Sequence, residues 1–188
     1  MKITIDRVEL AQFTPEDTRL LYDIRNHDSV RSFMSNSAPL EYEKHEAWVK
    51  KNLIDGRGFL LLLVRVAGRG PIGFTLLQRK SPDTAEIGVI FREAAQHPVV
   101  PIVATVGTLH LAWCHLSLAG LVSYVSPTNE RALALNRGFG MAEVESDKPG
   151  ELKMYISRDV CLANRNYVRV FRRMEDKLTI TGLDADTW

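Results

Sequence analysis

The chain has 188 residues, a formal net charge of +1 and a hydrophobic fraction of 45%, values that are ordinary for one globular domain. A charge so close to zero gives no overall field for nucleic acid or an anionic membrane, so we expect neither as a partner. The two cysteines, Cys114 and Cys161, lie far apart in sequence, which argues against a disulfide framework, and we expect no metal site. The N-terminal segment has no apolar signal-peptide core, which favours a cytoplasmic protein.

The first elements are predicted from alternation and from helix-start signals. Apolar residues from Ile3 to Leu10 alternate with polar ones, which predicts a first strand. Thr14, Pro15 and two following acids predict a helix start, because the hydroxyl caps free amides and acids favour the positive end of the dipole. Residues 41–53 again show helical periodicity, which predicts a further helix.

Three apolar runs follow, at Phe59–Val66, Ile72–Gln78 and Ala85–Phe91, and short turns between them predict an antiparallel meander. After Phe91 the apolar residues repeat at helical spacing, which predicts a helix that ends before a buried strand at Leu121–Val125. A crossing of this length can join parallel strands, so we expect a mixed, mostly antiparallel sheet with flanking helices. The apolar face of the crossing helix comprises Ile102, Val106, Leu109, Trp113 and Leu116.

The last part of the chain predicts a helical extension. Tyr167, Phe171, Met174 and Leu178 repeat at helical spacing, so we divide the chain into a domain over 1–159 and a C-terminal helical extension and tail over 160–188. Its apolar stripe has two open interpretations, as cover for a sheet edge or as a homodimer contact. Its basic face is either solvated or a contact for RNA, for the phosphate of a bound ligand or for a partner. The arginines of that face are Arg165, Arg169, Arg172 and Arg173.

Residues 120–140 carry the most informative pattern: a buried strand, a Ser-Pro-Thr stop, a short Asn-Glu-Arg-Ala helix and a Gly-Phe turn. By itself this is a strand–helix–strand unit of an α/β domain. The pattern resembles the acceptor-side half of the GNAT N-acetyltransferase superfamily. That resemblance implies the GNAT fold, of the α/β (α+β) class, with acetyl-CoA as co-substrate.

The resemblance also assigns roles along the third meander strand and after the next one. Backbone groups of Val89, Ile90 and Phe91 would pair with the pantetheine arm. Glu86 occupies a position where many members carry a general-base glutamate that acts through water, although an exposed strand carboxylate is the simpler interpretation. Asn129 matches the asparagine that contacts the cofactor arm or orients the acceptor, and capping of its own helix would demand the same residue type.

The loop after Phe91 departs from the family pattern. Residues 92–103 contain no glycine, whereas the family's glycines let backbone N–H groups wrap the CoA pyrophosphate at a helix N-terminus. Two prolines in this loop each remove a further N–H donor. We therefore expect weakened phosphate binding that depends on the amides of Ile102 and Val103 and on the charges of Arg92 and His97.

A second departure is Asn136, which stands where many members carry a tyrosine that protonates the leaving thiolate. An amide cannot supply a proton, although it can donate a hydrogen bond to the thiolate. Tyr124 and Tyr155 are substitutes by residue type only. Because a thiol has a pKa of about 8.5, its thiolate can leave without an acid, so the loss lowers the rate without excluding the chemistry.

The segments Arg25-Asn26 to Met34 and His45-Glu-Ala-Trp48 resemble GNAT members that acetylate nucleotide-linked amino sugars and, less closely, ribosomal-protein acetyltransferases. The first resemblance implies that Arg25 and Arg31 hold an anionic diphosphate. For His45 and Trp48 the alternative is packing of their helix on the sheet. The expected acceptor contacts are Arg25, Asn26, Arg31, His45 and Trp48.

These features together predict an acetyl-CoA-dependent N-acetyltransferase that acts on the primary amine of a small molecule, with a nucleotide-linked amino sugar as the favoured acceptor. Two alternatives stay open. One is a GNAT-fold protein that binds a ligand or partner without catalysis, and the other is a protein N-acetyltransferase.

Overall fold

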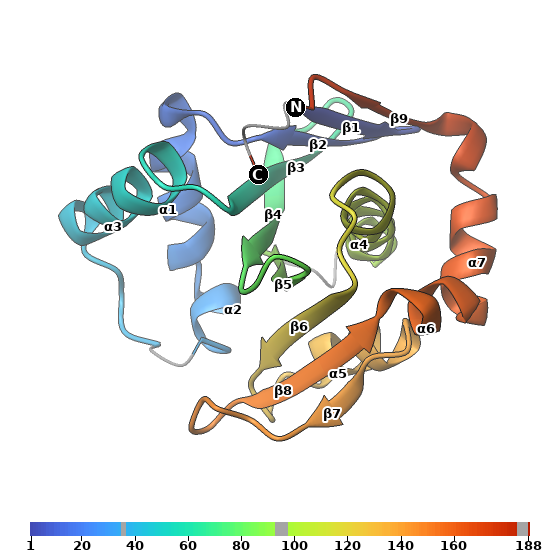
Figure 1. The fold of residues 1–188 in the computed structure, drawn as a ribbon. Coiled ribbons are helices and arrows are strands. Elements are labelled where there is room, and N and C mark those ends of the chain that lie inside the picture. Colours follow the sequence, from blue (N-terminus) through green and yellow to red (C-terminus); the bar gives the residue numbers. More distant parts are fainter. Residues whose placement is uncertain (35–36, 93–97, 184–187) are drawn as a thin grey trace.

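The computed structural model describes residues 1–34, 37–92, 98–183 and 188, so His97 and much of the expected phosphate loop lie outside the described residues. Within those ranges nine strands form one sheet in the order β7-β8-β6-β5-β4-β3-β2-β1-β9, and only the β5–β6 pair is parallel (Figure 1). The expected mixed, mostly antiparallel sheet is therefore confirmed. The strands are β1 (Lys2–Ile5), β2 (Val8–Gln12), β3 (Phe59–Val66), β4 (Pro71–Arg79), β5 (Thr84–Phe91), β6 (Gly120–Val125), β7 (Ala142–Val144), β8 (Leu152–Ser157) and β9 (Leu178–Thr181).

The first predicted strand is in fact a hairpin, and the single-strand prediction was wrong. Strands β1 and β2 pair with Ile5 opposite Val8, and Asp6 in the turn has a φ of 53°, a left-handed conformation that aspartate tolerates better than most residues. The buried positions change from odd to even numbers across this turn, since Ile3 and Leu10 are both fully buried. That change of parity marks a turn inside an apparently continuous alternation.

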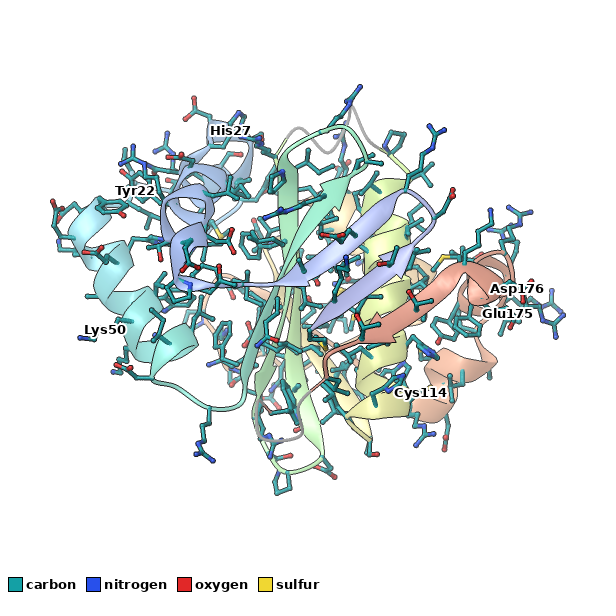
Figure 2. All side chains as sticks on the ribbon, turned by 90° about the horizontal axis from the view of Figure 1, so that it is seen from above. Tyr22, His27, Lys50, Cys114, Glu175 and Asp176 are labelled. Atoms are coloured by element: carbon teal, nitrogen blue, oxygen red, sulfur yellow. The ribbon has the colours of Figure 1, made fainter. Side chains whose placement is uncertain are left out.

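Helices cover both faces of the sheet. In Figure 2 the helices that carry Tyr22 and Lys50 lie on one side, and those near Cys114, Glu175 and Asp176 lie on the other. Thr14 starts the first helical segment as expected, because its backbone N–H donates to Asp17 Oδ2 at 3.0 Å in a capping box. The helices are α1 (Thr18–Asn26), α2 (Asp28–Arg31), α3 (Tyr42–Val49), α4 (Val100–His110), α5 (Glu130–Gly138), α6 (Arg158–Ala163) and α7 (Arg165–Arg172), with π-helical turns at Lys50–Ile54 and Leu111–His115 and 3-10 turns at Pro15–Asp17 and Glu175–Lys177.

The central strand β3 explains how two cores form on one sheet. Its leucines are buried on both faces: Leu61 and Leu63 pack under α1 and α3, and Leu60 and Leu62 belong to the larger core on the opposite face. A strand buried on both sides reads as an unbroken apolar run, as residues 59–64 do. The smaller core comprises Phe13, Leu21, Ile24, Val49, Leu61, Leu63 and Phe74.

The C-terminal extension is only partly helical. Helix α7 ends at Arg172, and Leu178, which we expected on the same helix, begins strand β9. Strand β9 pairs with β1, with Ile180 opposite Ile3, so the extension lengthens the sheet. Met174 is buried in the turn between the helix and the strand and anchors this change of direction. In the described ranges, no helix is long and apolar enough to cross a membrane.

Candidate active site

Strands β5 and β6 part in the middle of the sheet, and this opening organises the candidate site. Their parallel pairing is limited to Thr84–Glu86 against Gly120–Val122, although β5 continues to Phe91 and β6 to Val125. On its other side β5 stays paired with β4 up to Phe91. Figure 1 shows β6 and β8 inclined away from β4 and β5. The edge of β5 that carries Val89, Ile90 and Phe91, the expected pantetheine contacts, therefore faces an opening in the sheet, which we call the β5–β6 wedge.

Glu86 is the last residue of β5 that pairs with β6, so its side chain lies where the wedge begins. Its carboxylate is 19% exposed and forms ion pairs through one oxygen, with Lys80 Nζ at 2.7 Å and Lys148 Nζ at 3.4 Å from Oε2. No partner of Oε1 occurs among the described residues. The carboxylate is thus fixed by one oxygen while the other remains able to accept a proton. The two lysines were not foreseen from the sequence.

Lys148 also connects Glu86 to the aromatic side chain of β6. Its Nζ lies 3.5 Å from the centre of the Tyr124 ring, and the Tyr124 hydroxyl donates to Asp147 Oδ1 at 2.7 Å. Hydrogen bonds from Lys153 and then Tyr124 lower the pKa of Asp147 to about 2. Burial, followed by the bond to Asp147, raises the pKa of Tyr124. A phenol that holds its proton this firmly is a poor replacement for the missing general acid.

The two asparagines of the α5 region have different environments. Asn129 caps α5, because its side-chain oxygen accepts from the Ala132 N–H at 3.1 Å, as the simpler interpretation required. Its amide nitrogen has no partner in the part of the chain that the structure describes, so the same side chain retains donors for a ligand. Asn136, by contrast, directs its amide nitrogen to Met154 Sδ at 3.6 Å on β8. That donor is used in packing α5 on the sheet.

The first turn of α4 supplies fewer donors than expected. The Val103 N–H donates to the Val99 carbonyl at 3.0 Å, so the prediction of a free Val103 amide was wrong. Pro101 has no N–H, and the Ile102 N–H has no partner within the described residues. Arg92 donates through one guanidinium nitrogen to the Pro71 carbonyl at 3.1 Å, which fixes it near the end of β5. Ile102 and the remaining donors of Arg92 are therefore available for an anion.

On the acceptor side, Asn26 and Arg31 hold the backbone together. Asn26 Oδ1 accepts from the Leu40 N–H at 2.9 Å. Arg31 donates to the carbonyls of Asn26 and Ser37, each at 3.0 Å, and forms an ion pair with Asp28. The Arg31 guanidinium contacts three groups of this segment, so its role is to stabilise the local fold. The structure does not favour the diphosphate contact that we expected from it.

Arg25, His45 and Trp48, three of the expected acceptor contacts, lie next to one another. The Arg25 guanidinium lies 4.8 Å from the Trp48 ring centre, and the His45 and Trp48 rings stack at 6.3 Å. Arg25 has no hydrogen bond or ion pair with any described residue, and partial burial lowers its pKa. A half-buried guanidinium with free donors beside an indole is a binding group for an anion or a planar group. His45 and Trp48 also pack against Tyr22 and Phe59, which fits the packing alternative.

We expect His45 to make stability depend on pH. His45 is 3% exposed, and its pKa is lowered from 6.5 by burial and then by the charge of Arg25, against a smaller opposing effect of the Thr18 backbone. The folded chain therefore resists the proton that the unfolded chain accepts, so stability is complete above about pH 6.5 and is lost as the pH falls below it. Urea unfolding of His45→Phe between about pH 8 and about pH 5 should show a smaller loss than the wild type. The same pH dependence in His45→Phe and in the wild type would contradict this assignment. The pKa of His110 is also lowered, so His110→Phe is measured in the same way to compare the contributions of the two histidines.

A family model and solved structures agree with this geometry. No protein with a curated description matches the chain in sequence. The family model described as "Acetyltransferase (GNAT) domain" matches residues 7–142, well over half of the chain. The chain belongs to the GNAT acetyltransferase family. Members of this family transfer the acetyl group of acetyl-CoA to an amine, and the protein is accordingly an acetyl-CoA-dependent N-acetyltransferase.

Solved structures share the GNAT fold at low sequence identity. Spermidine N-acetyltransferase from Vibrio cholerae, in complex with CoA and spermine, has a TM-score of 0.71 at 19% identity over 83% of this chain and 98% of its own. A GNAT-family acetyltransferase from Bacillus anthracis has a TM-score of 0.68 at 17% identity over 85% of this chain and 99% of its own. A dodecameric form of the Vibrio enzyme gives 0.67 at 19%, covering 85% and 98%. At these identities the likeness concerns the fold.

The wedge residues fit acetyl-CoA as the co-substrate of this GNAT protein. An open strand edge from Val89 to Phe91 suits an extended arm with amide groups, and Arg92 with the Ile102 amide suits its phosphates. As for metals, the described ranges contain no group of three His, Cys, Asp or Glu side chains placed to hold an ion.

Proposed function

We propose that the protein acetylates the primary amine of a small molecule that carries negative charge, with a nucleotide-linked amino sugar as the favoured class. The observation that supports this most is the position of Glu86, where β5 and β6 separate, with one carboxylate oxygen fixed by lysines. The resemblance to GNAT enzymes, many of which carry a general-base glutamate at this position, supports the same role for Glu86.

Each side chain then has a defined task. Acetyl-CoA supplies the activated acetyl group when bound. Glu86 accepts the amine proton through Oε1, directly or through one water, while Lys80 and Lys148 hold Oε2. The Asn129 amide nitrogen donates to the pantetheine arm or the acceptor, because its oxygen is used in the helix cap. Neither Tyr124 nor Asn136 is placed to deliver a proton to the thiolate, so departure without an enzymatic acid is part of the proposal.

Charge near the wedge favours an anionic acceptor over a polycation. The ammonium groups of Lys80 and Lys148 lie within 3.4 Å of Glu86 Oε2, and a polyamine would have to approach both of them. Like charges repel, although solvent screens the repulsion here because the Lys80 and Lys148 side chains are 36% and 42% exposed. Arg25, with no acidic partner among the described residues, adds a further positive group on the acceptor side.

A polyamine is the second candidate, because solved structures of the same fold are spermidine acetyltransferases. A panel of acceptors at fixed acetyl-CoA, followed by release of free thiol, separates the candidates. The panel contains nucleotide-linked amino sugars, simple amino sugars, spermidine and peptides with a free N-terminus. We expect the highest kcat/KM with a nucleotide-linked amine. A preference for spermidine would overturn the anionic acceptor, a preference for peptides would favour a protein N-acetyltransferase, and no thiol release with any amine would favour a non-catalytic binding protein.

Arg25 should contribute binding energy more than chemistry. Arg25→Ala is expected to raise the KM of a nucleotide-linked acceptor by about tenfold or more with a smaller change in kcat, since one charge-assisted hydrogen bond is worth roughly 1.5–3 kcal/mol. Arg19→Ala is the matched control, because Arg19 lies on the same helix, is exposed and packs over the rings of Tyr22 and Tyr42. An unchanged KM in Arg25→Ala would remove Arg25 from the acceptor site.

A further inference from the structure

Helix α7 exposes a concentration of positive charge that the active site does not use. Its outer side carries four exposed arginines with no acid between them, at positions 165, 169, 172 and 173. Spacings of three and four residues place them on one side of the helix, where like charges destabilise it. The helix dipole favours cations in the last turn only and so does not account for the whole set. A ligand of opposite charge would relieve the repulsion among these arginines.

The four arginines form no ion pair with a described residue, a property that they share with other exposed cations such as Lys51, Arg57 and Arg131. Within the described ranges, the one side-chain hydrogen bond of the four runs from Arg169 to Asn166 Oδ1 at 3.1 Å. Each of the four guanidinium groups therefore retains hydrogen-bond donors for a ligand.

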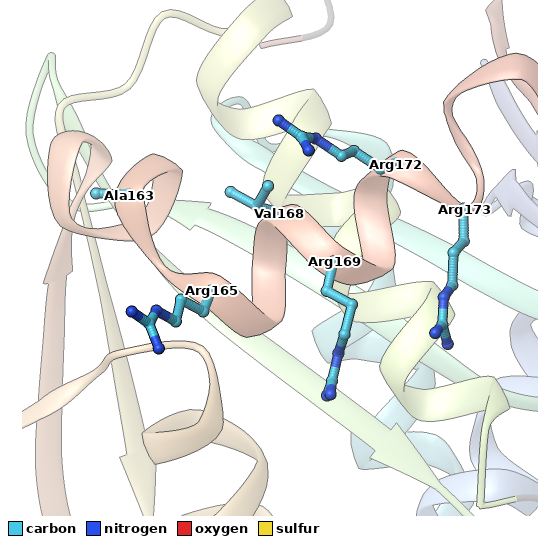
Figure 3. Close-up of a pocket in the computed structure, with 6 residues that line it drawn as sticks. All are labelled: Ala163, Arg165, Val168, Arg169, Arg172 and Arg173. Atoms are coloured by element: carbon cyan, nitrogen blue, oxygen red, sulfur yellow. The ribbon is translucent and has the colours of Figure 1, made fainter.

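A hollow lies among these side chains. It is a hollow of about 490 Å³ that is open to solvent, and in Figure 3 the side chain of Arg172 extends past Val168 while those of Arg169 and Arg173 extend away from it, with Ala163 at the end of α6. The opposite side of α7 is fixed to the core, since Tyr167 is buried and Phe171 stacks on His110 at 5.0 Å. The hollow is thus formed on a helix with a fixed position. We call it the α7 arginine hollow, with the residues Ala163, Arg165, Val168, Arg169, Arg172 and Arg173.

We propose that the α7 arginine hollow binds a small molecule with two or more phosphate charges, such as the pyrophosphate group of a nucleotide. Guanidinium groups form paired hydrogen bonds with phosphate oxygens, and every cation in this hollow is arginine. Val168 and Ala163 give a neutral floor for the rest of the ligand. None of the six residues belongs to the β5–β6 wedge, so this site is separate from the acetyl-transfer site and independent of the proposed acceptor.

The test is a calorimetric titration of the full chain with inorganic pyrophosphate and, separately, with ADP, in the absence of acetyl-CoA, because acetyl-CoA carries a pyrophosphate group and would itself compete for the hollow. The variants below distinguish binding in the hollow from binding in the wedge. We expect saturable binding with a Kd below about 1 mM that weakens as ionic strength rises. The double variant R169A/R172A should weaken it by about tenfold or more, and R169K/R172K should weaken it too, because lysine keeps the charge but loses the paired geometry. Arg158→Ala removes an exposed arginine outside the hollow and should bind like the wild type.

Thermal unfolding and acetyl-CoA turnover of each variant verify that the fold and the wedge are intact. Equal affinity in R169A/R172A and the wild type would overturn the proposal, as would the absence of saturable binding at millimolar pyrophosphate and ADP. Tight binding of a single-stranded RNA oligonucleotide without binding of the small phosphates would also overturn it, in favour of a nucleic-acid surface.

Discussion

Replacement of Glu86 by glutamine should reduce kcat by a factor of roughly 100 to 10,000, the usual effect of removing a general base. Glutamine keeps the shape of the side chain but cannot accept the amine proton at neutral pH. The KM of acetyl-CoA should change little, because the expected contacts of the pantetheine arm are backbone groups of Val89, Ile90 and Phe91. Steady-state kinetics of Glu86→Gln, with thermal unfolding as a check of the fold, measures both quantities. A fall in kcat of less than about fivefold would remove Glu86 from the role of base.

Two kinds of control separate the proton-accepting role of Glu86 from its ion pairs. Lys80→Met and Lys148→Met each remove one ion pair and keep the carboxylate. If either reduced kcat as much as Glu86→Gln, the ion pairs themselves would be the essential feature. Glu9→Gln changes another ion-paired strand glutamate, on β2 with Lys2 as partner, and should leave turnover unchanged.

Truncation of Phe74 should have the largest effect on stability. Phe74 on β4 is 1% exposed and belongs to the core beneath α1 and α3. Phe74→Ala is expected to lower the free energy of unfolding by about 3–5 kcal/mol, through the lost burial and the cavity left behind. That is a large part of the 5–15 kcal/mol that typically stabilises a domain. For a chain of this size the Tm should fall by on the order of 10 °C.

Chemical and thermal unfolding of Phe74→Ala measure this loss, and Phe33→Ala is the control because Phe33 is 41% exposed. The control should stay within about 0.5 kcal/mol of the wild type. Because the same core supports Arg25 and Trp48, Phe74→Ala should also raise the acceptor KM at temperatures where the chain is still folded. Equal stabilities of the two variants would mean that this core contributes little to folding.

The meander, the crossing helix α4 and the position of Glu86 could all be predicted, because each depends on local periodicity or on a family pattern. Lys148 could not, since it reaches Glu86 from a loop 62 positions away in sequence and no local rule predicts such a pairing. The role of Arg31 was equally hidden, because two of its three partners are backbone carbonyls, which every residue has.

The error at Leu178 has a different cause. Its spacing from Met174 suits a helix, but residues 178–181 alternate leucine or isoleucine with threonine, a pattern typical of a strand. The sequence around Leu178 therefore fits both a helical and a strand periodicity, and pairing with β1 stabilises the strand. For Asn129 both interpretations of the sequence remained open, and the structure is compatible with both, because the cap uses only the side-chain oxygen.

The pairing of β9 with β1 has a consequence for how the chain acquires its structure. Ile3 and Ile180 lie near opposite ends of the sequence, yet they are direct neighbours in the sheet. During synthesis the β1–β2 hairpin emerges well before β9, the partner that completes β1, because all the other strands of the sheet lie between them in the chain. Until then the outer backbone groups of β1 remain unpaired and can associate with other unfinished chains. Such distant contacts also close slowly. Conditions that delay the synthesis of β9 should therefore promote aggregation even where the completed enzyme is stable.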